Sequence, residues 1–308
     1  MRRYAVTHFY HSGFSVSCGD TILVFDYWRG ENGELAENLQ LTPEILGAYS
    51  HIIVFISHDH PDHMDPVVFT WKDVPGLQYV IASDMPAGTP GLRLAPGDSE
   101  ELPGDVKVTA FDSTDLGVSF LVDFRGLSVF HAGDLNFWHW REESTMKEIE
   151  EADREFRKAV APICGKAVDL AFFPVDPRQG PLFESGANYF ILAVKPRILI
   201  PMHYFNRPES AVEYARTATC RTTEVIAMPG NGDVLLMDED EQGYLNLSIP
   251  ELPEEPSEPE PAVPADPLLP ENDPFLESDL PLVQLAENPP APPPAPEAEK
   301  EAPGPSEP

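Results

Sequence analysis

The feature of this sequence that most limits how it can fold is an apolar segment that leads directly into a cluster of metal-ligating side chains. Residues 51–57, His-Ile-Ile-Val-Phe-Ile-Ser, form the continuous apolar run that is typical of a strand buried on both faces. Residues 58–63 then carry three histidines and two aspartates in six positions. Because a strand buried on both faces needs covering layers, this pattern predicts a layered α/β fold with a polar cluster at a strand end.

The order hairpin, helix, buried strand occurs twice along the chain, which predicts two sheets stacked face to face. We expect helices on both outer surfaces, and therefore an α/β fold of four layers, an αββα sandwich. The expected elements are a hairpin over 14–25, a helix after Thr42, the strand at 51–57, a helix over 65–72, strands at 77–83 and 106–111, a second hairpin over 117–131, a helix over 142–160, and buried strands at 168–174 and 197–201.

The composition changes abruptly after residue 250. Residues 251–308 hold 18 of the 35 prolines and 15 acidic residues, with Lys300 as their single base. Such a segment buries too little apolar surface to offset the entropy of ordering, so we expect a disordered acidic tail. Residues 1–250 are expected to form one folded domain.

The charge of the chain limits its partners. A net charge of −32 repels phosphate backbones, so we expect no nucleic-acid partner. No stretch reaches the roughly 18 apolar residues that a membrane span requires, and the first residues lack the apolar core of a signal peptide. Three scattered cysteines form no paired framework, which is typical of a reducing compartment. We therefore expect a cytoplasmic location.

Residues 58–63 offer the ligand types of a reactive metal site. Imidazole and carboxylate groups bind zinc, iron or manganese while leaving coordination positions open for water. Their place at the end of a rigid strand keeps the entropy lost on metal binding small. The alternative interpretation is a polar loop in which the histidines occur by coincidence, and five candidate ligands in six residues argue against it.

The pattern His58-x-His60-x-Asp62-His63 resembles the signature of the metallo-β-lactamase superfamily. Other landmarks of that superfamily follow in order over essentially the whole of residues 1–250: Asp26 after the first hairpin, Asp134 in His-Ala-Gly-Asp, and His203 in Ile-Pro-Met-His. The segments beginning at His11 (His-Ser-Gly-Phe) and His131 (His-Ala-Gly-Asp) are similar to one branch. That branch contains the ascorbate-6-phosphate lactonase-like metallohydrolases, relatives of the phospholipase D that cleaves N-acyl phosphatidylethanolamines.

The resemblance implies one or two divalent cations and their ligands. His58 and His60 would hold the first cation, and Asp62, His63 and His203 the second, with Asp134 bridging the two. Asp62 and Asp134 would serve catalysis, while Asp26 would orient a ligand histidine without touching metal. A water shared by two cations is acidified enough to supply hydroxide near neutral pH, so the implied activity is hydrolysis. Zinc is the expected metal, with manganese or iron as alternatives.

One landmark of the superfamily is absent, because the loop over residues 111–117 has no histidine where a third ligand of the first cation is usual. Asp115 could replace it as an oxygen ligand, and His139, between Trp138 and Trp140, is another candidate. We therefore expect a robust second site and a first site that is weaker or selective for a harder metal such as manganese.

Several further residues have both a functional and a structural interpretation. His11 and His131 would lie close to the site, yet either could be a hydrogen-bonded structural histidine. Trp138 and Trp140 could line a substrate pocket or pack in the core. Arg178 could bind a phosphate or carboxylate of the substrate, or form a salt bridge with Asp176.

The leading hypothesis is a hydrolase that acts on an ester, lactone, amide or phosphoester of a small molecule. If Arg178 binds the substrate, that molecule is anionic. The alternatives are a metal-binding sensor or scaffold without catalysis, which the absent histidine and the acidic tail favour, and a nuclease, which the acidic composition disfavours. The sequence leaves the substrate and the oligomeric state open.

Overall fold

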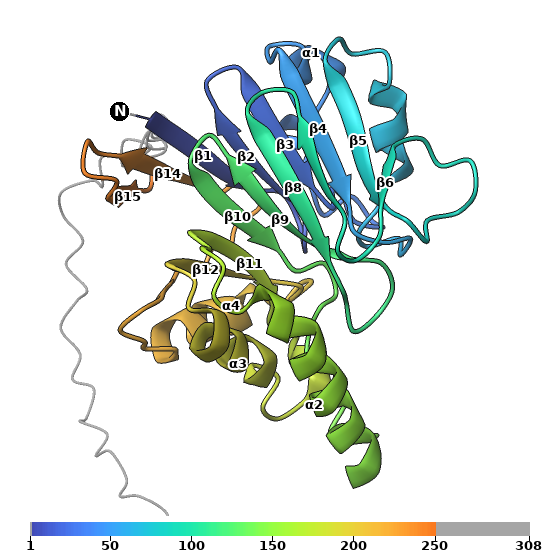
Figure 1. The fold of residues 1–308 in the computed structure, drawn as a ribbon, viewed down its shortest axis with the longest axis vertical. Coiled ribbons are helices and arrows are strands. Elements are labelled where there is room, and N and C mark those ends of the chain that lie inside the picture. The colour runs from blue at the N-terminus through green and yellow to red at the C-terminus, as the bar shows by residue number, and fades with distance from the viewer. Residues whose placement is uncertain (1, 251–308) are drawn as a thin grey trace, which may run out of the picture. The chain divides into compact units, whose positions relative to one another are not determined.

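Two stacked β-sheets form the centre of the protein (Figure 1). The structure is a computed structural model that describes residues 2–250; the expected tail over 251–308 lies outside the described residues. The first sheet has eight strands in the order β15-β14-β1-β2-β3-β4-β5-β6, and the second has seven in the order β13-β12-β11-β10-β9-β8-β7.

The strands of the first sheet come from both ends of the described chain. They are β1 (Arg2–His8), β2 (Phe14–Cys18), β3 (Thr21–Phe25), β4 (His51–Ile56), β5 (Leu77–Ala82), β6 (Leu92–Leu94), β14 (Val234–Glu239) and β15 (Leu245–Ser248). The second sheet consists of β7 (Ser99–Leu102), β8 (Val106–Phe111), β9 (Ser119–Phe124), β10 (Leu127–His131), β11 (Leu170–Pro174), β12 (Ile198–Met202) and β13 (Glu224–Val225).

Each sheet combines an antiparallel hairpin with a run of parallel strands. The hairpins are β2–β3 and β9–β10. In the first sheet β3, β4 and β5 run parallel, and in the second β10, β11 and β12 do so. Parallel neighbours end at the same edge of a sheet, so the residues that follow these strands are brought together there.

The core between the sheets explains why the central strands read as unbroken apolar runs. On β11 the ring of Phe172 stacks on Phe14 of the first sheet, with 4.2 Å between ring centroids. The next residue, Phe173, points the other way and packs on Phe190 of α3 (Ser185–Val194) at 4.6 Å. Successive side chains of a strand face opposite sides, so a strand covered on both sides needs apolar residues at every position.

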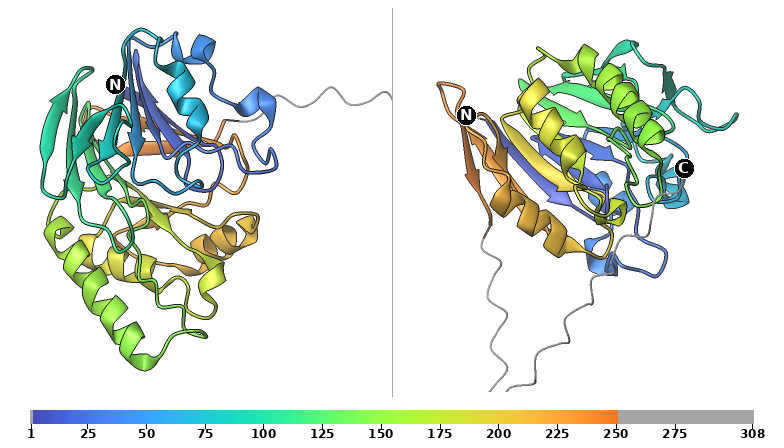
Figure 2. Two further views of the ribbon diagram at one scale, coloured as in Figure 1. Left: turned by 90° about the vertical axis from the view of Figure 1, so that its right-hand side faces the viewer. Right: turned by 90° about the horizontal axis from the view of Figure 1, so that it is seen from below.

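Helices cover the outer face of the second sheet, and Figure 2 shows them together on the side away from the first sheet. They are α2 (Met146–Val160), α3 and α4 (Pro208–Thr217), with the 3₁₀ turns η3 (Ala161–Ile163) and η4 (Pro177–Gln179) between them. The first sheet is accompanied by shorter elements: η1 (Glu37–Leu39), α1 (Pro43–Leu46) and η2 (Pro66–Trp71). None of the described helices combines the length and the apolar character needed to cross a lipid bilayer.

The predicted α/β fold with two face-to-face sheets is confirmed, and two expected helices need correction. The helix expected from residue 142 begins at Met146, because Thr145 and Glu148 form a reciprocal capping box there. The helix expected over 65–72 is the 3₁₀ segment η2. The hydroxyl of Tyr79 donates to the carbonyl of Val68 at 2.6 Å, which occupies an acceptor that an α-helix would use.

Candidate metal centre

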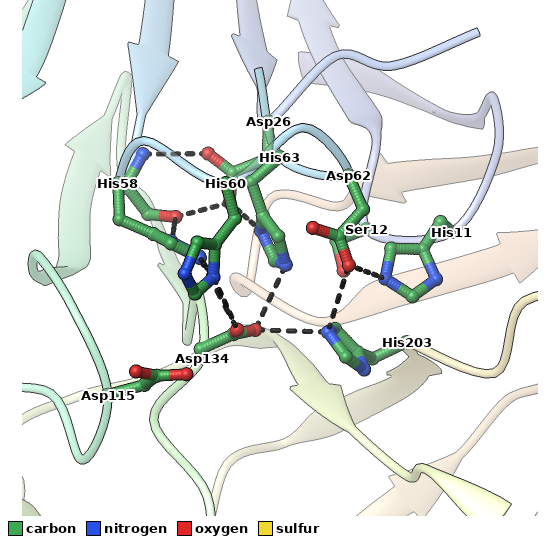
Figure 3. A network of polar contacts seen from close by, with 12 residues as sticks. His11, Ser12, Asp26, His58, His60, Asp62, His63, Asp115, Asp134 and His203 are labelled. Carbon is green, nitrogen blue, oxygen red and sulfur yellow. Dashed lines mark hydrogen bonds and ion pairs between the residues drawn. The ribbon is translucent and has the colours of Figure 1, made fainter. Parts of the chain in front are cut away.

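The candidate site lies where five strands end at one edge of the two sheets. Asp26 follows β3, Asp134 lies three residues after β10, and His203 follows β12 directly. The histidine-rich segment 58–63 begins two residues after β4. His11 reaches the same place from the turn between β1 and β2 (Figure 3).

The first group of candidate ligands consists of His58, His60 and Asp134. Nε2 of His58 lies 3.0 Å from Nδ1 of His60 and 3.3 Å from Oδ2 of Asp134. Nδ1 of His60 lies 4.0 Å from the same carboxylate oxygen. His58 is buried, whereas the side chain of His60 is 39% exposed, so this group opens toward solvent on the His60 side.

The second group consists of His11, Asp62, His63 and His203. The other oxygen of Asp134, Oδ1, lies 3.0 Å from Nε2 of His63 and 3.1 Å from Nε2 of His203. The two oxygens of one carboxylate therefore face the two groups, and Asp134 lies between them (Figure 3).

The spacing of these atoms fits cations better than it fits hydrogen bonds. Four of the converging atoms are buried and have no hydrogen-bond partner among the described residues: His11 Nε2, His63 Nε2, Asp134 Oδ1 and His203 Nε2. Buried polar atoms are otherwise almost always paired. Ligand atoms about 2.0–2.2 Å from a zinc ion lie roughly 3 Å from one another, which is the spacing found here. The residues present therefore fit the expected metal ions.

Hydrogen bonds at Nδ1, on the side of the ring away from Asp134, fix the orientation of His63 and His203. Nδ1 of His63 lies 2.7 Å from Oδ2 of Asp26, and Nδ1 of His203 lies 3.0 Å from Oδ2 of Asp176. Asp26 also accepts from the backbone N–H of Ser57 at 2.8 Å and from its hydroxyl at 2.6 Å. These contacts leave the Nε2 atoms of both histidines directed at Asp134, an arrangement known to orient metal ligands.

The electrostatics of the centre follow from burying opposite charges together. Burial disfavours a charged His63, but Asp134 and Asp26 raise its pKa well above the ordinary value. His203 is also buried, and Asp134 and Asp176 raise its pKa. Burial likewise opposes ionisation of Asp134, yet the two histidines lower its pKa well below the usual range. Without a cation, protons on the histidines balance the carboxylate charge.

Asp176 and His11 respond to burial in different ways. The buried carboxyl of Asp176 would tend to stay neutral, but its hydrogen bonds with His203 and Arg178 lower its pKa to about 2. His11 has no comparable set of close carboxylates, and burial lowers its pKa to about 3. At neutral pH Asp176 is therefore an ionised acceptor and His11 is a neutral ring.

Backbone strain is concentrated at this centre. His11, Asp26 and His203 have φ angles of 57°, 40° and 67°, and Phe205 and Trp140 have φ angles of 47° and 37°. Non-glycine residues seldom adopt positive φ, and such strain persists where the surroundings hold it and collects at functional sites. The strain supports a rigid, preorganised site.

A pocket of about 420 Å³ opens above the ligand groups. Two stacked indoles form one wall, with 5.7 Å between the ring centroids of Trp138 and Trp140 and 10° between their planes. The pocket is lined by His60, Asp62, Thr114, Asp115, Asp134, Trp138, Trp140, Arg178 and His203. Asp115, one of the two expected replacements for the absent histidine, is therefore at the pocket, and Figure 3 shows its side chain beside Asp134.

Two histidines named from the sequence lie outside both ligand groups. Nε2 of His139 is 3.1 Å from the carbonyl of Leu182, and Nδ1 accepts from the backbone of Arg141, so both ring nitrogens have backbone partners. The expectation that His139 could replace the missing ligand is therefore corrected by its position. His131 is likewise held, by the carbonyl of Ser12 and the N–H of Gly133, and its ring stacks on Phe25.

Arg178 combines both contacts considered for it from the sequence. Its Nε and Nη2 bind the carboxylate of Asp176, at distances down to 2.6 Å, and its guanidinium lies 4.2 Å from the ring centre of Phe205. It also lines the pocket, and its side chain is 47% exposed. The salt bridge thus holds the arginine at the pocket wall.

Sequence reasoning missed the partner of His203. Asp176 was considered only as a salt-bridge partner of Arg178, although it also supports a candidate ligand. A signal was present, because Asp176 lies two residues after β11 and β11 is the parallel neighbour of the strand that precedes His203.

Comparison with known proteins relates the chain to metal-dependent hydrolases. No protein-family model matches the chain. The chain is 25% identical over 254 residues to a UPF0173 metal-dependent hydrolase of Heliobacterium modesticaldum, covering 76% of this chain and 97% of the relative. It is 26% identical over 212 residues to a UPF0173 metal-dependent hydrolase of Natranaerobius thermophilus, covering 64% and 82%.

Solved structures share the fold. Igni18, a metallo hydrolase from Ignicoccus hospitalis, aligns with a TM-score of 0.54 at 16% identity over 77% of this chain and 99% of its own. The metallo-β-lactamase fold protein YhfI from Bacillus subtilis aligns with a TM-score of 0.51 at 14% identity over 77% and 100%. The chain therefore has a metallo-β-lactamase-like fold and is similar in sequence to metal-dependent hydrolases.

Proposed function

We propose that residues 1–250 form a hydrolase that binds one or two divalent cations and cleaves an ester, lactone, amide or phosphoester bond of a small molecule. The observation that carries this proposal is the position of Asp134, whose two oxygens face two separate groups of buried ligands at 3.0–3.3 Å. A carboxylate between two cations offsets their mutual repulsion.

The ligand assignment follows the two groups. His58 and His60 would hold the first cation, Asp62, His63 and His203 the second, and Asp134 both. When bound, such cations lower the pKa of water and polarise the oxygen of a scissile carbonyl or phosphoryl group. Asp26 and Asp176 hold the rings of His63 and His203, and the partly exposed Asp62 faces the pocket, where its carboxylate can orient an attacking water.

The two sites differ in the number of candidate ligands that converge on them. With His63, His203 and Asp62 from its own group and Asp134 shared, the second site has two imidazoles and two carboxylates, a set that suits zinc. The first site has two imidazoles and Asp134, and Asp115 supplies a further oxygen at the pocket. The first site thus has fewer converging ligands, and its further donor is a carboxylate oxygen where the superfamily usually has an imidazole. Oxygen ligands favour a harder cation, so we assign zinc to the second site and a weaker, manganese-tolerant site to the first.

The pocket supports a small and anionic substrate. Its volume of about 420 Å³ is the size of a small-molecule site. Arg178 is the single arginine or lysine among the described residues that line it, and its salt bridge and stacking on Phe205 hold the guanidinium in place. A carboxylate or phosphate of the substrate would bind there, with an apolar portion against Trp138 and Trp140.

We also propose a cytoplasmic location. All three cysteines carry free thiols, and Cys164 is exposed. Exposed free thiols persist most readily in a reducing compartment.

Turnover by the full-length protein tests the hydrolase proposal. We expect protein loaded with zinc or manganese to hydrolyse at least one member of a panel of chromogenic lactones, carboxylate esters and phosphodiesters. Asp134→Asn should lower kcat/KM by more than about 100-fold. That loss exceeds the one expected from replacing a residue that only orients a ligand by a hydrogen bond. Asp123→Asn, on the exposed side of β9, serves as the matched control and should retain activity. Metal binding without any turnover across the panel would contradict the hydrolase and favour a sensor.

A further inference from the structure

His11 is the one member of the second group that the metallo-β-lactamase signature does not supply. Its side chain is fully buried, and its ring packs on His203 and Phe205 with centroid distances of 4.1 and 3.9 Å. Nε2 lies 3.4 Å from Oδ2 of Asp62 and has no hydrogen-bond partner that meets strict geometry among the described residues. His11 is thus either a further ligand or a hydrogen-bond donor to one.

The contacts of Nδ1, the ring nitrogen that faces away from the candidate cation, distinguish a metal ligand from a hydrogen-bond donor. In His63 and His203 this atom, Nδ1, faces a carboxylate, at 2.7 Å from Asp26 and 3.0 Å from Asp176. Ionised carboxylates only accept, so each Nδ1 carries a proton, and the proton that a cation displaces is the one on Nε2, whose lone pair then binds the cation.

His11 has the opposite environment. Its Nδ1 faces the backbone N–H of Phe205, which donates to it at 3.4 Å. A neutral imidazole has a single N–H, so a ring that accepts at Nδ1 carries its proton on Nε2. That nitrogen then has no lone pair for a metal, and the atom it faces is a carboxylate oxygen of Asp62.

We propose that His11 is a positioning residue, which donates a hydrogen bond from Nε2 to Oδ2 of Asp62 and does not itself bind a cation. Among the described residues the nearest charged or ring nitrogen to Asp62 is that of His11, at 3.4 Å, with Nε2 of His203 at 4.0 Å, so His11 would fix the rotation of that carboxylate. The same oxygen lies 4.0 Å from Nε2 of His203, so the hydrogen bond holds the carboxylate of Asp62 facing the second group (Figure 3).

The backbone supports this role. His11 adopts a φ of 57°, and its carbonyl accepts from the N–H of His203 at 3.3 Å. The strained turn between β1 and β2 is thereby tied to the loop after β12, where Phe205 supplies the N–H that selects the ring form of His11. The inference rests on the proposed function, because it assumes that Asp62 and its neighbours hold a cation.

Nitrogen NMR on the full-length protein tests the inference directly. The protein is labelled with ¹⁵N-histidine and loaded with ¹¹³Cd²⁺, and signals are assigned with single His→Gln variants. We expect cadmium–nitrogen coupling at Nε2 of His63 and of His203, no coupling at His11, and a proton on Nε2 of His11. Coupling at His11 Nε2, or a proton on its Nδ1, would overturn the inference. If no histidine couples to cadmium, the proposed function fails as well, so the two failures are distinguishable.

Two variants at position 11 provide a second readout. His11→Leu removes the donor at similar volume, and His11→Gln keeps a side-chain N–H. We expect His11→Leu to retain the number of zinc ions per chain but to weaken the second site by about 10–100-fold, the range typical of groups that orient ligands. His11→Gln should restore most of the affinity. Loss of one zinc ion per chain in both variants would show that His11 is a ligand.

Discussion

Asp134 sets the charge balance of the whole centre, because every inner histidine is placed against it. Its carboxylate is within 3.3 Å of His58, His63 and His203 and is almost completely buried. A buried carboxylate needs positive charge nearby, which is supplied either by protonated histidines or by cations. The two states exclude each other, since a ligating imidazole must be unprotonated.

Cation binding is therefore predicted to release protons. The pKa values of His63 and His203 lie above the ordinary value in the absence of a cation, so both rings bind protons at pH 6, and zinc must displace them. Asp134 is already ionised and releases none. Zinc affinity should thus rise with pH until the pH exceeds the raised pKa values, and fall as the pH is lowered.

Calorimetric titration of zinc at pH 6 in buffers of different ionisation enthalpy measures this release. We expect between one and two protons per chain, and a smaller number for His203→Ala. A binding enthalpy that does not depend on the buffer would contradict the charge balance described for the centre.

At the scale of elements, the ends of strands and the loops between them position the ligands. The loop between β8 and β9 packs directly against the segment after β4. The N–H of Val118 donates to the carbonyl of Ser57 at 3.1 Å, and that of Gly117 donates to Asp84 at 3.0 Å. Gly117 has a φ of +72°, and a Cβ there would overlap the Ser57 carbonyl. The loop therefore supports His58 from one side.

A pair of glycine substitutions tests this support. Gly165 has a similar φ of +82° but nothing within 4 Å of a Cβ, so Gly165→Ala is a matched control for the backbone strain alone. We expect Gly165→Ala to lower the free energy of unfolding by about 1 kcal/mol. Gly117→Ala should lower it by about 2–4 kcal/mol, because the Ser57-His58 backbone must also move. It should weaken zinc binding too. Equal losses in urea unfolding would contradict the supporting role of the loop.

At the scale of the whole molecule, the elements near the site were the most predictable from sequence. The apolar run at 51–57 and the strand at 106–111 agree closely with β4 (His51–Ile56) and β8 (Val106–Phe111). A strand buried on both faces is apolar at every position, which is easily recognised in a sequence. The segment that carries the candidate ligands follows such a strand directly. The metallo-β-lactamase fold could therefore be predicted from residues 51–63 and the landmarks at 134 and 203.

Contacts between distant segments could not be predicted in this way. The first sheet is completed by β14, which pairs with β1 and brings Arg3 within 2.7 Å of Asp238. Nothing in either segment alone specifies that pairing. The roles of Asp176 and His11 were equally hidden, because each depends on which atom of a neighbouring loop faces a ring nitrogen.

The most direct test of the central claim is the metal content of the full-length protein after zinc loading and desalting, measured by plasma mass spectrometry. The account predicts one tightly held zinc ion per chain, with a second retained only when metal is in excess. The double variant His63→Ala/His203→Ala should lose the tight ion, and His51→Ala, at the far end of β4, should keep it. Wild-type protein that retains no zinc, or a double variant that retains as much as the wild type, would contradict a metal centre built from these residues.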